Sequence, residues 1–165
     1  MVDPSPDELA ARYDDVVRHG ETFELDREGF ERARRRADRW GVGALVHDDG
    51  RVLFVEQDGQ WFLPGGAREP GESLEAGAAR EVREETGVDV EVTDLVAISE
   101  QTFRHGDDRV DYFFATFEAR PEETTTSDDP GREGEGIQSA AWRSTVPPNT
   151  FDSDLVERLI GRFVE

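Results

Sequence analysis

Apolar residues follow two different periods along the chain, and the change falls near Trp40. Before it, apolar side chains recur every three or four positions within residues 5–19 and again in a second segment that reaches Trp40, which predicts two helices. The first helix is expected to end at Gly20. We therefore predict a helical extension over residues 1–36 and a main domain over residues 37–165.

Beyond Trp40 the chain consists of short apolar runs separated by turns that contain glycine. The turns Asp48-Asp49-Gly50 and His105-Gly106-Asp107-Asp108 each divide two such runs and so predict β-hairpins. The polar segment 121–136 predicts a mobile loop. We predict an α/β (α+β) fold with a mixed sheet between helices. Its strands are expected at 41–49, 51–58, 90–104, 108–120 and 137–144, and its helices at 74–86 and 153–165.

The stretch GAREPGESLEAGAAREVREETGV, residues 66–88, concentrates negative charge on one helix. Ser73 is typical of a helix N-cap and Gly87 of the residue after a helix, so the helix is expected to span residues 74–86. Apolar residues at every fourth position give this helix one face for the core. At about 100° per residue, three carboxylates lie on the flank of that face: Glu81, Glu84 and Glu85.

Carboxylates at this spacing repel one another, and more strongly where solvent is partly excluded. Arg80 can pair with Glu84, four residues further on. One guanidinium cannot also neutralise Glu72, Glu81 and Glu85, whereas two or more hard divalent cations can. The donors are oxygens only, and the chain has no Cys. This donor set predicts Mg²⁺ or Mn²⁺, whose coordination is normally completed by substrate phosphates.

The same stretch resembles the signature of the Nudix hydrolase superfamily, G-x5-E-x7-R-E-U-x-E-E-x-G-U with U aliphatic. Every defined position agrees, namely Gly66, Glu72, Arg80, Glu81, Val82, Glu84, Glu85, Gly87 and Val88. Chance agreement at all of them has odds on the order of one in ten million per window, so the match is specific. The resemblance extends from about residue 40 to the end, with WFLPGG as its lead-in, and leaves residues 1–36 outside.

The resemblance implies a Nudix-type α/β/α sandwich and hydrolysis of a pyrophosphate linkage in a nucleoside diphosphate derivative by a metal-activated water. The implied metal ligands are Glu81, Glu84, Glu85 and the carbonyl of Gly66. The resemblance also implies that Glu72 and Arg80 orient these ligands. The general base stays open among Glu84 and Glu85 on the helix and Glu133 and Glu135 in the 121–136 loop.

Contacts to the rest of the substrate are less well defined by the sequence. Arg68 and Arg104 are candidate phosphate contacts, although solvated surface arginines are the favoured interpretation. His47 and His105 lie at predicted turns, and we expect them to be solvated and without a role. Most aromatic residues on strands belong to the core, so we expect only one or two of four candidates to contact a base: Phe62, Phe103, Tyr112 and Trp142.

The charge balance limits the partners. The chain has 39 acidic and 19 basic residues, all of the latter Arg, for a net charge of −20. Such a field repels nucleic acid and anionic membranes, and is typical of an acidic, halophilic protein in a high-salt cytoplasm. No apolar run of membrane-spanning length and no signal-peptide pattern occurs, so we expect a soluble, cytoplasmic protein. The arginine cluster at residues 32–39 is interpreted as a solvated helical face.

Three functions stay in competition. The leading hypothesis is a magnesium-dependent nucleotide pyrophosphatase, with a homodimer through the N-terminal helices as one option. A Nudix-like sensor that binds a nucleotide or ADP-ribose without turnover is the second, and the complete box argues against it. Removal of pyrophosphate from RNA 5′ ends is the third, motivated by the arginine cluster.

The sequence narrows the substrate only in part. Relatives that act on ADP-ribose tend to carry a proline downstream of the box, and those that act on dinucleoside polyphosphates a tyrosine. The comparable region here reads TFRHGDD and has neither, and the motif tied to NADH-specific relatives is also missing. A nucleoside triphosphate, a modified nucleotide or a nucleotide sugar is left as the expected substrate.

Overall fold

One mixed sheet runs through the molecule in the computed structural model, which describes residues 3–37, 40–126 and 137–164. Strands are hydrogen-bonded in the order β1-β6-β7-β2-β3-β4, with β5 paired to β2 and β8 to β3. The pairs β1–β6 and β2–β7 are parallel, and the other pairs are antiparallel. The strands are β1 (Val17–Glu24), β2 (Gly41–Asp48), β3 (Arg51–Gln57), β4 (Gln60–Phe62), β5 (Gly65–Ala67), β6 (Val90–His105), β7 (Asp108–Pro121) and β8 (Ile137–Arg143).

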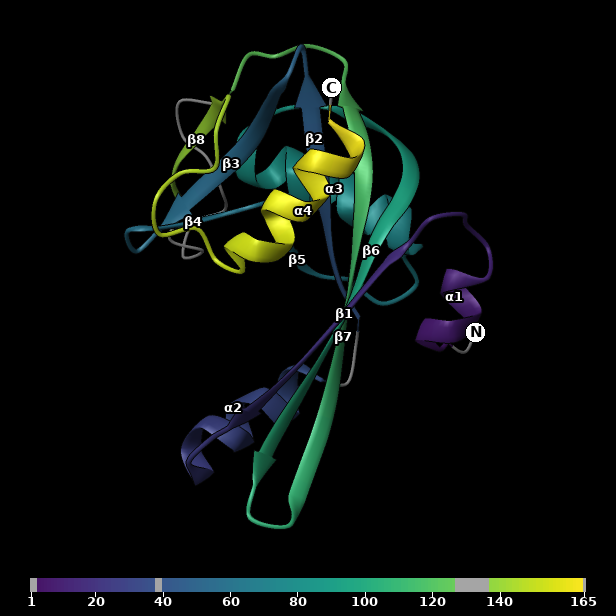
Figure 1. Cartoon of the computed structure of the whole chain (residues 1–165), viewed down its shortest axis with the longest axis vertical. Coiled ribbons are helices and arrows are strands. Elements are labelled where there is room, and N and C mark those ends of the chain that lie inside the picture. The colour runs from purple at the N-terminus through teal and green to yellow at the C-terminus, as the bar shows by residue number, and fades with distance from the viewer. Residues whose placement is uncertain (1–2, 38–39, 127–136, 165) are drawn as a thin grey trace.

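Two of the helices cover opposite faces of this sheet, as Figure 1 shows. On β2, Val42 and Ala44 belong to the clusters that contain the apolar face of α3, whereas Leu45 packs with residues of α4. This alternation is the period of a strand that is buried on both faces. The predicted α/β/α arrangement is therefore confirmed. The described helices are α1 (Pro6–Ala10), α2 (Arg27–Arg36), α3 (Leu74–Thr86) and α4 (Ser153–Phe163).

Both predicted hairpins are confirmed. Asp49 and Gly50 connect β2 to β3 with φ values of 52° and 78°, the left-handed region that a two-residue turn of this hand requires. The β6–β7 hairpin closes where His105 faces Asp108. Helix α3 has the predicted bounds, and α4 begins at Ser153 as expected.

The predicted helix over residues 5–19 is wrong. Only Pro6–Ala10 is helical, and from Val17 the chain forms β1, which pairs in parallel with β6. Apolar positions that suggested a helix still contribute to the core beside α3, where Leu9 is buried and Tyr13 is partly buried. Pairing with a distant strand overrode the local helical period. The extension is thus not purely helical, and its strand continues the main sheet.

The far end of the β6–β7 hairpin leaves the body that carries α3 and α4, and α2 lies beside it (Figure 1). A small hydrophobic cluster joins them, with Phe30 and Ala33 of α2 packed against Phe103 of β6. Phe23 of β1 stacks on Phe103 with ring centroids 5.5 Å apart. Helix α2 is therefore anchored to the hairpin, although it ends at Arg36, before the predicted Trp40.

Two remaining expectations concern the loop and the membrane. Of the predicted loop at 121–136, residues 127–136 lie outside the described residues, and Glu133 and Glu135 lie there with them. In the part of the chain that the structure describes, no helix combines the length and the apolar character that crossing a membrane requires.

Candidate active site

Helix α3 begins and ends where its sequence dictates. The Ser73 side chain accepts a hydrogen bond from the Ala76 N–H at 3.1 Å, and Gly87, at φ 78°, closes the helix with its N–H bonded to the Arg83 carbonyl. Gly77 is buried within α3, where a glycine lowers helical stability. A larger residue would not fit, because a Cβ there would lie 2.8 Å from Glu72 Oε1. The glycine thus allows the loop that carries Glu72 to pack closely against the helix.

The α3 carboxylates lie at the edge of the core, as the helical spacing predicts. Glu81 and Glu85 are only 8% and 5% exposed. The Gly65 N–H donates to Glu85 Oε1 at 2.7 Å, so strand β5 lies directly on the helix. A Cβ at Gly66 would lie 2.7 Å from Glu81 Oε2, so glycine is needed for the backbone to approach this carboxylate.

Arg80 organises the acidic cluster. Its Nε and Nη2 donate to the two carboxylate oxygens of Glu72 at 2.7 and 3.0 Å, a bidentate pair. Its Nη1 donates to Glu81 at 2.9 Å and to Glu84 at 3.0 Å. The hydrogen bonds to Glu72, followed by those to Glu81, raise the pKa of Arg80, and the same pair lowers the pKa of Glu72. Arg80 thus contacts more carboxylates than the single partner that helical spacing predicts.

A cavity of about 870 Å³ opens beside this cluster. One part of its wall is formed by Gly65, Gly66 and Glu85. We use the name α3 wall for these three residues together with Glu81 and Glu84, which are neighbouring box carboxylates. Another part is formed by Arg35 and Arg36 of α2, which we call the α2 wall. Aromatic side chains of β6 and β7 and residues of α4 complete the lining, among them Phe103, Tyr112, Phe114, Asp152 and Leu155.

The structure separates the predicted substrate contacts. Phe62, Phe103 and Tyr112 line the cavity. Trp142 does not belong to that lining, and its indole N–H donates to the Thr124 carbonyl. Phe62 also stacks on Phe151, with centroids 5.6 Å apart, at the rim of the cavity.

Neither predicted phosphate-binding arginine is a lining residue. Arg68 is largely buried and donates to Asp3 at 2.7 Å, so it is not the solvated arginine that we favoured. Arg104 is exposed and lies 3.9 Å from Glu24.

The two histidines expected to be solvated have partners instead. His47 Nε2 lies 2.6 Å from Glu118 Oε2, and His105 Nδ1 lies 2.9 Å from the Leu25 carbonyl. His47 is therefore not the solvated side chain that we expected. Glu118 is on β7, which pairs with β2 in parallel, and this contact is invisible in the local sequence.

Several lining residues were not predicted. Arg35 and Arg36 were interpreted as part of a solvated face, and Asp152 was not among the predicted site residues. Asp152 makes no side-chain capping bond to α4. Among the described residues, Phe151 is the exposed large hydrophobic side chain, at 43% exposure. The position of this aromatic residue next to Asp152 is the feature of the sequence that could have pointed to this part of the cavity.

A second acidic group borders the cavity through Asp152. Within the described residues, one set of His and acidic side chains brings its ligand atoms within 4.8 Å of one another: His19, Glu21 and Asp152. His19 Nε2 is buried, lies 3.5 Å from Asp152 Oδ2, and has no hydrogen-bond partner among the residues that the structure describes. The parallel pairing of β1 with β6 brings His19 to this place, and nothing in the local sequence predicts this contact.

The α3 wall fits a divalent cation. Its donors are carboxylate oxygens, and Glu81 and Glu85 are nearly buried, where gathering several negative charges is unfavourable unless cations lie close to them. The backbone at Gly66 approaches Glu81 because no side chain intervenes. Hard oxygen donors of this kind suit Mg²⁺ or Mn²⁺.

An α/β/α sandwich in which helix α3, on one face of the sheet, carries this carboxylate box defines the class of protein. Comparison with known proteins agrees with this class. The NUDIX domain model matches residues 37–157, so the chain belongs to the Nudix family. Hydrolases of this family generally use divalent metal ions.

Curated relatives and a solved structure resemble parts of the chain. A MutT-like protein of Streptomyces ambofaciens is 47% identical over 65 residues, which are 38% of this chain and 42% of that protein. Nudix hydrolase 5 of Arabidopsis thaliana is 33% identical over 113 residues, 63% of this chain and 35% of that protein. The chain thus spans less than half the length of these relatives. A NUDIX hydrolase structure from Nitrosomonas europaea matches with a TM-score of 0.61 at 23% identity, covering 76% of this chain and 71% of the other, and shows the shared fold.

Proposed function

We propose that the protein is a divalent-metal-dependent hydrolase that cleaves a pyrophosphate linkage in a nucleoside diphosphate derivative. The observation that carries the proposal is the folded box, in which Glu81 and Glu85 are nearly buried beside Gly66 and Glu85 lines a cavity large enough for a nucleotide. Membership of the Nudix family and relatives named as hydrolases support it. The expected substrates are a nucleoside triphosphate, a modified nucleotide or a nucleotide sugar.

The α3 wall would hold the metal. Glu81, Glu84 and Glu85, with the carbonyl of Gly66, supply oxygen donors for Mg²⁺ or Mn²⁺. When bound, such a cation lowers the pKa of a water and neutralises charge on phosphate oxygens. Arg80 is the positioning residue, since its bonds to Glu81 and Glu84 keep these carboxylates on one flank of the helix.

Glu72 positions Arg80 in turn. Its bidentate pair with Arg80 is reinforced by the Glu69 N–H, which donates to Glu72 Oε1 at 3.0 Å. Four hydrogen bonds to carboxylates hold the Arg80 guanidinium, so it loses little freedom when the site is loaded, and the ligand oxygens are pre-organised.

Glu85 is the preferred general base. It is the box carboxylate that lines the cavity, and the Gly65 N–H fixes the orientation of one of its oxygens. A base must lie within hydrogen-bond reach of the water whose proton it takes, and this location provides that access. Glu84 is turned toward Arg80 through its Oε2.

The stacked pair Phe62–Phe151 offers a surface for the nucleobase. Phe151 is 43% exposed at the cavity rim, where a flat aromatic ring can be covered by a second one. Stacking is tolerant of base identity, so this pair supports nucleotide binding in general and not one particular base.

A nucleotide panel tests the proposal. Nucleoside triphosphates, nucleotide sugars and dinucleotides are incubated with Mg²⁺, with Mn²⁺ and with a chelator, and release of phosphate, pyrophosphate and nucleoside monophosphate is followed. We expect metal-dependent cleavage of at least one substrate class. Binding without turnover across the panel would contradict the proposal and favour a sensor.

The second acidic group requires a control, since it also offers ligand atoms. Cation binding is measured by calorimetry for the unaltered protein, for Glu85→Gln and for His19→Gln. We expect Glu85→Gln to weaken the uptake that supports turnover, and His19→Gln to leave turnover unchanged. The reverse result would move the catalytic metal to the group around His19.

A further inference from the structure

We propose that Arg35 and Arg36 form a binding site for a second phosphate group of the substrate, one that is separate from the scissile linkage. The inference rests on the proposed function and names its preferred substrate class: nucleoside diphosphate derivatives that carry an additional phosphate monoester. The site lies outside the residues matched by the Nudix domain model, because α2 ends at Arg36 and the match begins at residue 37.

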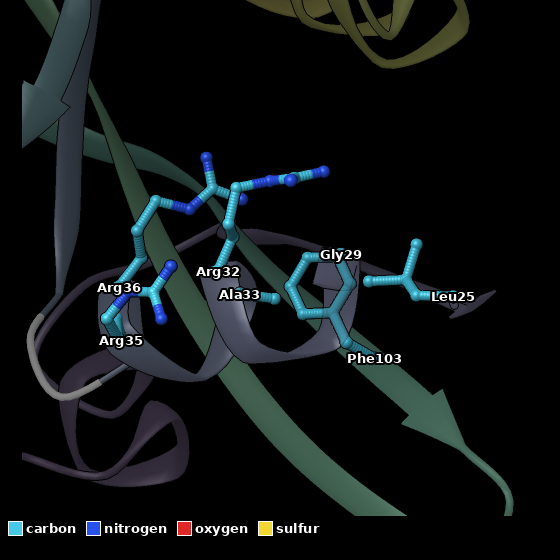
Figure 2. Close-up of a pocket in the computed structure, with 7 residues that line it drawn as sticks. All are labelled: Leu25, Gly29, Arg32, Ala33, Arg35, Arg36 and Phe103. Carbon is cyan, nitrogen blue, oxygen red and sulfur yellow. The ribbon is translucent and has the colours of Figure 1, made fainter. Parts of the chain in front are cut away.

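Both arginines line the same cavity as the catalytic wall. Arg35 and Arg36 border the cavity of about 870 Å³ together with Gly66 and Glu85. They also border an adjoining hollow of about 530 Å³, whose other lining residues include Arg32, Leu25 and Phe103. Figure 2 shows the three arginine side chains extending from one side of α2 beside Phe103. A ligand that occupies the cavity therefore meets the Glu85 carboxylate on one wall and guanidinium groups on another.

The charges on α2 are compensated unequally. Arg32 pairs with Glu28 at 3.0 Å, and Arg34 pairs with Glu31. Within the described residues, Arg35 and Arg36 form no ion pair, and the contact of Arg36 is with the Tyr112 ring, 5.9 Å from the centroid. In a chain with a net charge of −20, two adjacent arginines that pair with no carboxylate in the described part of the chain are therefore available to a ligand.

The helix that carries the two guanidinium groups is anchored by buried contacts and by an N-terminal cap. Phe30 and Ala33, one turn earlier on α2, are 4% and 2% exposed in the cluster with Phe103. The Asp26 side chain caps the helix by accepting from the Gly29 N–H at 2.7 Å. Arginines on an anchored helix lose less freedom on binding than arginines on a loop, and their planar donors match phosphate oxygens.

A small molecule fits these observations better than a polynucleotide. The cavity has the size of one small ligand, and its floor is aromatic, with Phe103, Tyr112 and Phe114 in the lining. The overall charge of −20 opposes a long polyanion, whereas a cavity with local cations can accept a single compact anion. RNA is accordingly an outcome of the test and not the proposed ligand.

The first experiment compares matched substrates that differ by one phosphate. The pairs are NAD with NADP and dephospho-coenzyme A with coenzyme A, each assayed with Mg²⁺. We expect kcat/KM to be about tenfold or more higher for the phosphorylated member, as for a hydrogen bond to a charged group. The gain should appear in KM, because the additional phosphate does not react. Equal kcat/KM values within both pairs would overturn the proposal.

The variants locate the preference. The double change Arg35→Gln with Arg36→Gln should remove the preference and leave kcat unchanged for NAD and dephospho-coenzyme A. Arg34→Gln is the matched control, because Arg34 belongs to the same helix but pairs with Glu31 and is not a lining residue. A preference that survives the double change, or that Arg34→Gln also removes, would contradict the assignment. A stronger preference for 5′-triphosphorylated RNA than for any small molecule would contradict it as well.

A binding measurement without metal separates this proposal from the proposed function. Adenosine 3′,5′-bisphosphate and AMP are titrated into chelator-treated protein by calorimetry. We expect the bisphosphate to bind about tenfold more tightly, with an affinity that falls as salt rises and a difference that the double change removes. If the panel shows no turnover but this difference persists, the arginine site stands and the hydrolase does not. If the two ligands bind equally, the arginine site fails whatever the panel shows.

Discussion

The two charged walls of the cavity are built in opposite ways. The α3 wall is nearly buried and partly compensated from within, since Arg80 contacts two of its carboxylates, Glu81 and Glu84, and the Gly65 N–H contacts the third, Glu85. The α2 wall is exposed, and within the described residues its two arginines have no carboxylate partner. A wall that satisfies its own charges can be pre-organised before a ligand arrives, whereas an uncompensated wall gains only when one binds. The α3 wall is therefore suited to catalysis, and the α2 wall is suited to discrimination between substrates.

Removing one charge from the α3 wall should produce the largest effect. Glu85→Gln keeps the size of the side chain but loses a carboxylate at the cavity, and we expect turnover to fall by at least about 10²-fold. Steady-state kinetics on the substrate identified by the panel provides the measurement, with thermal unfolding to verify the fold. Glu75→Gln is the matched control on the same helix, since Glu75 accepts from the Tyr13 hydroxyl away from the cavity. Equal losses in both variants would show that the helix, and not the cavity carboxylate, was being tested.

Removing Arg80, the guanidinium that pairs with carboxylates of the α3 wall, should lower the stability of the fold as well as the catalytic rate. Arg80→Gln leaves Glu72, Glu81 and Glu84 without their common partner, and we expect the metal-free protein to lose about 3 kcal/mol of unfolding free energy. Added Mg²⁺ should restore part of it by binding the folded state. Denaturant titration with and without chelator checks both statements. Arg36→Gln should cost less than about 0.5 kcal/mol, because its removal breaks no ion pair in the described part of the chain. Similar losses in the two variants would erase the contrast between the walls.

The α3 wall could be predicted because its determinants are local. Ser73, Gly87 and the four-residue apolar repeat define α3, and the box spacing identifies which carboxylates share a flank. The exception is Arg80, for which helical spacing predicts Glu84 alone. Its bonds to Glu72 depend on how the loop before α3 folds back, and no periodicity reports this.

The α2 wall could not be predicted for the complementary reason. Periodicity shows that Phe30 and Ala33 face a core, but not what the neighbouring arginines face. Their position depends on β1 pairing with β6, which places Val17 beside Ala97. The same distant pairing overturned the helix predicted over residues 5–19 and brought His19 to Asp152. Errors in the sequence analysis therefore concentrate where a non-local strand decides the outcome.

Detaching α2 should weaken selection without stopping the chemistry. Phe30→Ala removes the main anchor of a small cluster at the end of the hairpin, away from the body around α3. We expect α2 to open locally, and KM for the phosphorylated substrates to rise about tenfold while kcat for the others is kept. Hydrogen exchange should show lost protection at residues 27–36 and intact protection at residues 74–86. Phe30→Leu is the control that retains an apolar anchor. Lost protection in both helices would mean that the two walls form one cooperative unit.

The smallest expected effect uses the two tyrosines as reporters of the two regions. The chain has no Lys and no Cys, so Tyr13 and Tyr112 dominate side-chain titration at alkaline pH. Burial, followed by the hydrogen bond to Glu75, raises the pKa of Tyr13 to about 12. Burial also raises the pKa of Tyr112, where Arg36 acts in the opposite direction and Glu81 in the same one. Charges of both the α2 wall and the α3 wall therefore act on the pKa of Tyr112.

The sign follows from these directions. Each tyrosine has a folded pKa above its unfolded value of about 10, so its contribution to stability is complete below that pH and is lost as pH rises through the folded pKa. For Tyr13 the window runs from about pH 10 to about pH 12. Tyr13→Phe should flatten the loss of stability there, as measured by denaturant unfolding at several pH values. In tyrosinate absorbance titrations of Tyr13→Phe, adding Arg36→Gln should move the remaining transition to higher pH, because the cation that opposes the shift is gone. An unmoved transition would mean that Arg36 does not act on Tyr112 in solution, and the α2 wall would then be less fixed against the hairpin than its packing indicates.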